Sequence, residues 1–200
     1  MDRLQRPPHD IFDRLKQAWR SWRPDDHHIP LKTAVRPQDI HTILPYVMMM
    51  KYKGDGIAEY TLIGEQIKEL YANKLQNQTT GDIRPLIQKQ LSFHRFMIAQ
   101  MAEYLCGVET KRQLNDNRSI EWAYRVIALP LRGKDDLYFI LAIDLAPPDQ
   151  MDPTSWHLAT SFDIENTILS SVKRLDTGSG VFDIPPEFQN LITDKGIEVI

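Results

Sequence analysis

Residues 137–145 read LYFILAIDL, and this run decides the fold class that the sequence predicts. In an extended strand its apolar side chains alternate between the two faces of a sheet, Phe139, Leu141 and Ile143 on one face and Ile140 and Ala142 on the other. A strand that is apolar on both faces needs a cover on each side of its sheet. The run therefore predicts a layered α+β domain around a buried central sheet.

Four further strands are predicted upstream of this run, from short apolar stretches that lie between turn signals. They occupy residues 46–50, 57–63, 109–114 and 119–131. Gly54-Asp55-Gly56 would join the first two strands as a hairpin, and Asn115-Asp116-Asn117 would join the last two. We therefore expect an antiparallel sheet of about five strands.

Two predicted helices can cover this sheet. The longer one, residues 86–105, is expected across one face. The other, residues 10–22, starts at the potential N-cap Asp10 and keeps its apolar side chains within one arc: Ile11, Phe12, Leu15, Ala18, Trp19 and Trp22. This N-terminal helix or a second subunit would cover the opposite face. The candidates for a homodimer interface are therefore Phe12, Leu15, Trp19 and Trp22.

The composition becomes more polar after Pro147-Pro148. Helical spacing relates four apolar residues in this part and predicts a helix there: Ile164, Ile168, Val172 and Leu175. We expect three segments: an N-terminal helix in residues 1–24, a core domain in residues 25–146, and a C-terminal extension in residues 147–200 that is partly helical or disordered.

Charge is unevenly distributed along the 200 residues. The net charge of −3 argues against a nucleic-acid binder. Residues 1–23 hold six Arg and Lys against three Asp, whereas residues 144–200 hold ten Asp and Glu against three Lys and Arg. A basic arm and an acidic tail of this kind can contact partners or each other.

The sequence favours a cytoplasmic protein that does not enter a membrane. Its longest purely apolar run, residues 137–143, is far too short to span a bilayer. The N-terminal residues MDRLQRPP contain no apolar signal region. The single cysteine, Cys106, has no partner within the chain for a disulfide and fits a reducing compartment.

The order of the predicted elements resembles that of the PAS family, and several residue groups add to the likeness. They are Trp22-Arg23, Ile43-Leu44-Pro45, residues 60–67 (YTLIGEQI) and Leu129-Pro130-Leu131. Over about residues 15–145 the chain looks like the small bacterial proteins that contain little besides a PAS domain. It departs from them at residues 76–80, a longer stretch than those proteins usually have there. The resemblance implies signal detection or protein docking, often as dimers, with no family-wide catalytic residues.

His94 is the residue that most invites a functional interpretation. On the predicted long helix it shares an apolar stripe with Ile98 and Met101, where a polar ring needs a partner or a cavity. The candidate pocket residues are His94, Ile98 and Met101 from the helix and Tyr60, Leu62, Trp122 and Tyr124 from the strands. A hydrogen-bonded core histidine is the simpler alternative. Some PAS domains hold haem through a histidine on the corresponding helix, but we expect no haem and no other cofactor here.

The motifs of common enzyme chemistries are absent from the sequence. It contains no GxGxxG or GxxxxGK[ST] loop, no CxxC and no HExxH. Asp25-Asp26-His27-His28 is expected to be a solvated loop rather than a metal site, because adjacent side chains of an extended loop point in opposite directions. We therefore expect a non-enzymatic sensory or regulatory domain that binds a small ligand and signals in trans through contacts with an unknown protein. The alternative is a ligand-free interaction module; an enzyme is a third, less favoured reading.

Overall fold

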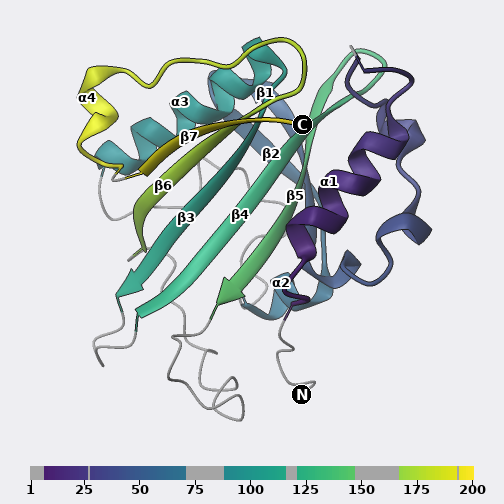
Figure 1. The fold of residues 1–200 in the computed structure, drawn as a ribbon, viewed down its shortest axis with the longest axis horizontal. Helices are drawn as coiled ribbons and strands as arrows, with labels where there is room; N and C mark the ends of the chain where they lie inside the picture. Colours follow the sequence, from purple (N-terminus) through teal and green to yellow (C-terminus); the bar gives the residue numbers. More distant parts are fainter. Residues whose placement is uncertain (1–6, 27, 71–87, 116–120, 147–166, 193) are drawn as a thin grey trace.

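The computed structural model describes residues 7–26, 28–70, 88–115, 121–146, 167–192 and 194–200. Within them, seven strands form one mixed sheet in the spatial order β2-β1-β5-β4-β3-β6-β7 (Figure 1). The strands are β1 (Val47–Gly54), β2 (Ile57–Ile63), β3 (Gly107–Asn115), β4 (Glu121–Arg132), β5 (Leu137–Ala146), β6 (Thr167–Asp176) and β7 (Asp194–Val199). The five strands predicted from the sequence form the contiguous part β2-β1-β5-β4-β3.

The predicted hairpin is confirmed, and its turn also touches the long helix α3 (Gln88–Tyr104). β1 and β2 pair antiparallel, and Gly54, Asp55 and Gly56 all have positive φ, of 99°, 51° and 70°. A Cβ atom on Gly56 would lie 2.1 Å from the backbone oxygen of Arg95. Glycine is therefore needed at this position for its conformation and for the close approach of the turn to α3.

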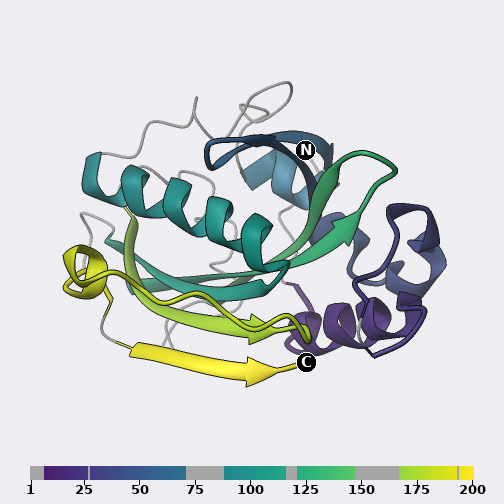
Figure 2. The ribbon, with the colours of Figure 1, turned by 90° about the horizontal axis from the view of Figure 1, so that it is seen from above.

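The sheet is covered on both faces. Figure 2 shows α3 on one side and α1 (Ile11–Trp22) on the other. We call the two sides of the core the α3 layer and the α1 layer. From β5, Phe139, Leu141 and Ile143 lie in the α3 layer, while Ile140 and Ala142 lie in the α1 layer. The alternation predicted for residues 137–145 is confirmed, and the N-terminal helix is the cover of the second face.

Short helical segments connect these elements. Three 3-10 helices, Lys32–Ala34, Pro37–Ile40 and Leu44–Tyr46, lead from α1 into β1, and α2 (Glu65–Leu70) follows β2. Gly64 starts α2, where a Cβ atom would lie 2.3 Å from the backbone oxygen of Pro45. The hairpin is thereby packed closely against the segment that precedes it.

The five predicted strands pair antiparallel as expected, but the sheet has seven strands in place of about five. β6 adds to β3 antiparallel, and β7 adds to β6 parallel, which makes the sheet mixed. The helix predicted from Ile168, Val172 and Leu175 is also wrong, because these residues belong to β6. Val172 lies in the α3 layer and Leu175 in the α1 layer, so residues with helical spacing also suit a strand buried on both faces. Ile164 lies outside the described residues.

The division of the chain at residues 24 and 146 stays a prediction. Of the C-terminal extension, residues 167–192 and 194–200 are described, and they provide β6, the short helix α4 (Pro186–Gln189) and β7. The segment between β6 and β7 packs on the α3 layer through Phe182, Ile184 and Ile192. These described parts of the extension share the sheet and the core of residues 25–146.

Candidate functional site

The α3 layer is the candidate ligand site. From α3 it takes Phe93, Met97, Ile98 and Met101, all buried. β1 contributes two more methionines, Met48 and Met50, because alternate residues of a strand face the same side. Four of the chain's seven methionines, Met48, Met50, Met97 and Met101, therefore belong to the α3 layer. Methionine side chains are unbranched and adaptable, so they can repack around different shapes.

An aromatic cluster occupies part of this layer. Phe93 and Phe96 of α3 stack at 6.1 Å between ring centroids, and Phe188 of α4 lies 5.1 Å from Phe93. Phe182, from the segment between β6 and β7, meets Phe96 edge to face at 5.7 Å. The C-terminal segment therefore fills this part of the α3 layer with the protein's own side chains.

His94 lies at the flank of the buried stripe of α3 and is partly buried. The predicted stripe was centred on His94, whereas the observed one runs through Phe93, Met97 and Met101. The apolar residues of α3 are spread widely enough around the helix for both stripes to have helical spacing, and packing selects the one with the larger side chains. Burial lowers the pKa of His94 to about 3, and the nearby positive charge of Arg112 lowers it further. The imidazole is therefore neutral at pH 7.

The other predicted pocket residues are distributed unevenly. Ile98 and Met101 are buried in the α3 layer, and Tyr60 packs against it. Leu62 does not belong to the α3 layer, because 41% of its surface is exposed. A register shift between Met49 and Met50 opposite β2 gives β2 one extra residue, so Ile63 instead of Leu62 packs on the α3 layer. Trp122 and Tyr124 belong to β4, but their side chains lie outside what the structure describes.

The four predicted interface residues of the N-terminal helix are used within the chain itself. Phe12, Leu15, Trp19 and Trp22 are all buried in the α1 layer. The indole N–H of Trp19 donates to the backbone oxygen of Pro130 at 2.8 Å, and that of Trp22 donates to Asp39 Oδ2 at 2.7 Å. Their apolar surface and their indole N–H groups thus have partners within the same chain, and their assignment to a dimer interface stays a prediction. The homodimer itself stays a prediction.

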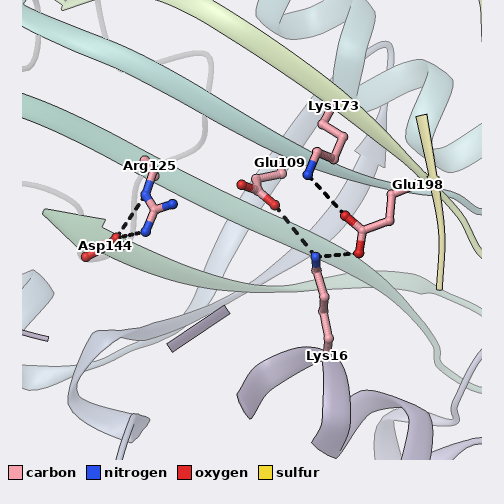
Figure 3. A network of polar contacts seen from close by, with 6 residues as sticks. All are labelled: Lys16, Glu109, Arg125, Asp144, Lys173 and Glu198. Carbon is pink, nitrogen blue, oxygen red and sulfur yellow. Dashed lines mark hydrogen bonds and ion pairs between the residues drawn. The ribbon is translucent and has the colours of Figure 1, made fainter. Parts of the chain in front are cut away.

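A row of charged side chains lies on the α1 side of the sheet (Figure 3). Lys16 of α1 is buried, and its Nζ lies 2.8 Å from Glu198 Oε1 on β7 and 3.7 Å from Glu109 Oε2 on β3. Lys173 Nζ of β6 lies 3.2 Å from the other carboxylate oxygen of Glu198. Lys16 is not among the apolar residues of the predicted helix, so its burial does not follow from the sequence pattern. The opposite charges of the two ends of the chain were the available signal, and here those ends do contact each other.

The electrostatics of Glu198 depend on this row. Burial alone would raise its pKa, but the hydrogen bonds from Lys16 and Lys173 outweigh burial, and the net effect is a lowered pKa. Beyond it, Arg125 pairs with the buried carboxylate of Asp144 through its Nε at 2.9 Å. The ring of Phe12 lies 5.1 Å from the guanidinium carbon of Arg125. The underside of α1 thus rests partly on paired charges.

In the described part of the chain, neither Cys106 nor any group of metal-binding side chains indicates a reactive or metal site. Burial raises the pKa of Cys106 to about 12, so its thiol stays protonated. No group of three or more His, Cys, Asp or Glu within the described residues is arranged to hold a metal ion. Among the same residues, no helix has the length and apolar character needed to cross a membrane.

Comparison with protein families identifies a family for this chain. The family model described as PAS domain matches residues 8–141, which run from just before α1 into β5. No curated protein and no solved structure matches the chain. The segment that forms β6, α4 and β7 lies outside the matched residues. By this match over two thirds of its length, the chain belongs to the PAS domain family.

Proposed function

We propose that this PAS domain is a non-enzymatic sensor that binds a small ligand in the α3 layer and signals in trans through protein–protein contacts. PAS domains are sensory or regulatory domains in general, and the family match supports that broad role. The ligand, the partner protein and the way the signal passes between them belong to the proposal.

The observation that carries the proposal is the methionine content of the α3 layer. Met48, Met50, Met97 and Met101 all belong to this buried layer, and cores specified for rigidity use few methionines because the side chain packs in many ways. Such a layer can open around a small apolar molecule by changing side-chain rotamers. The neutral ring of His94 at its flank would supply one polar contact to the ligand.

A ligand-free interaction module is the second candidate, and the aromatic cluster favours it. Phe93, Phe96, Phe182 and Phe188 fill part of the α3 layer with rings 5.1 to 6.1 Å apart. If the rest of the layer is packed equally well, it leaves no room for a ligand. The protein would then act only through its surfaces.

Native mass spectrometry of the purified protein distinguishes these candidates. We expect a bound molecule that adds a defined mass under native conditions and is lost on denaturation. An absorbance scan of the same sample reports on haem, and a Soret band that disappears in His94→Ala would replace our proposal with a haem sensor.

Two histidine variants make this test specific. His94→Ala is expected to reduce the bound fraction, whereas His41→Ala, an exposed histidine on the α1 side of the chain, should leave it unchanged. Wild-type protein that carries no added mass, from several expression hosts, would favour the ligand-free module.

A further inference from the structure

We propose that the C-terminal strand β7 holds α1 on the sheet, chiefly through the ion pair between Lys16 and Glu198. We call β7 the strap. In this proposal α1 and β7 are released together, while the rest of the domain stays folded. The strap lies outside the residues that match the PAS family.

β7 buries little of its own apolar surface. It pairs with β6 alone in the described structure, through the register from Ser171↔Asp194 to Asp176↔Val199. Two of its apolar residues face solvent, Ile197 with 58% and Val199 with 76% of their surface exposed. An edge strand with so little buried surface is expected to open at lower free energy than the central strands.

Glu198 connects this strand to α1. Its two carboxylate oxygens accept from Lys16 Nζ at 2.8 Å and from Lys173 Nζ at 3.2 Å. If β7 leaves, Lys16 keeps only Glu109, whose carboxylate lies 3.7 Å away, as its partner in this row. The side chain of Lys16 is only 9% exposed, so its charge would lose its nearest compensation while still buried beneath α1. Release of β7 therefore favours release of α1.

A second set of contacts joins the ends of the same two elements. Arg23, the C-cap of α1, donates to the backbone oxygens of Ile200 and Thr177, both at 3.3 Å. The side chain of Ile200 is buried in the α1 layer. The backbone N–H of Ile200 donates to the backbone oxygen of Asp176 at 2.9 Å. The strap is thus fastened near the middle of α1 by Lys16 and at its end by Arg23.

The consequence concerns the sheet face that α1 covers. Beneath α1 lie the buried apolar residues Ile127 and Leu129 of β4 and Ile140 and Ala142 of β5. If the strap is displaced and α1 leaves with it, this face is uncovered. While β7 is in place, α1 keeps the face covered. The C-terminal strand then decides whether the α1 side of the sheet is available.

Hydrogen exchange followed by mass spectrometry on the full-length protein tests the strap. In Glu198→Gln we expect exchange on the order of tenfold faster in both β7 and α1, with α3 and β4 unchanged, because one charged contact has been weakened. Asp194→Asn is the matched control: it makes the same chemical change on an exposed position of β7 and should leave α1 unchanged.

Faster exchange in β7 without any change in α1 would overturn the proposal, and so would equal acceleration of all segments. Lys16→Met provides the second arm, since it removes the buried charge and keeps the length of the side chain. In that background Glu198→Gln should affect α1 much less than in the wild type. An undiminished effect on α1 would show that the ion pair between Lys16 and Glu198 does not connect the two elements.

Discussion

At the scale of single residues, the structure separates side chains that look alike in the sequence. Lys16 and Arg20 both lie outside the apolar arc of α1, yet Lys16 is buried over the sheet and Arg20 is exposed. Leu62 is as apolar as Ile63, but the extra residue in β2 leaves it exposed. Burial of such residues depends on strands distant in sequence, so local pattern cannot assign it.

His94 gives a prediction for pH dependence. Its folded pKa of about 3 lies below the ordinary value of 6.5, so the unfolded chain binds a proton that the folded protein does not. The stability that the neutral ring contributes to the folded protein is therefore fully present above about pH 6.5. It is lost as the pH falls toward 3. Between pH 7 and pH 5 we expect this residue to account for a loss of about 1–2 kcal/mol in unfolding free energy.

Urea unfolding of His94→Gln at pH 7 and pH 5 measures this contribution. The variant should lose less stability than the wild type over that interval, because glutamine does not titrate. His41→Gln is the control and should behave as the wild type does. An equal loss of stability in wild type and His94→Gln would show that His94 titrates normally in the folded protein.

At the scale of elements, the turn between β1 and β2 is positioned by its contact with α3. Gly56→Ala would place a Cβ atom 2.1 Å from the backbone oxygen of Arg95, a contact that only backbone movement relieves. We expect a loss of unfolding free energy of about 2–4 kcal/mol from the displaced hairpin and the strained positive φ.

Gly54→Ala separates the two causes. Gly54 also has a positive φ, but nothing lies within 4 Å of a Cβ atom there. Its substitution should cost only about 1 kcal/mol, the strain of the backbone alone. Equal losses in thermal or urea unfolding for the two variants would mean that the contact with α3 is unimportant.

Elements that carry their own local pattern could be predicted from the sequence. The glycines of the hairpin, the two apolar faces of residues 137–145 and the apolar arc of α1 each indicate one structure locally, and all three are found. β6 was missed because Val172 and Leu175 suit a helix and a strand equally. β7 was missed because Lys195, Gly196 and Glu198 give no strand signal, and its place depends on pairing with β6.

The candidate site was predicted only in part, for the same reason. Ile98 and Met101 follow from helical spacing and lie in the α3 layer. Phe182 and Phe188 approach that layer from the far end of the chain, and no local pattern connects them with α3. The charge of the two chain ends indicated a contact between them but could not identify Lys16 and Glu198 as the pair.

At the scale of the whole molecule, α1 is part of the core. Removal of residues 1–24 would uncover the α1 layer, including Ile127, Leu129 and Ile140, which are buried with α1 in place. We expect the truncated protein to self-associate and to unfold at a lower temperature than the wild type, because a continuous apolar sheet face is exposed. Sedimentation velocity and thermal unfolding would report this. A well-folded truncated protein with the wild-type Tm would mean that α1 is an accessory element.

The central claim is that the α3 layer admits a ligand, and the stability of His94→Ala at pH 7.5 tests it most directly. The measurement is the free energy of unfolding in urea, on protein freed of any bound molecule. At the edge of a ligand site the lost ring only enlarges a cavity that already exists, so we predict a change below about 0.5 kcal/mol. A loss of about 1–3 kcal/mol would contradict the account, because it would show that His94 packs in a filled core.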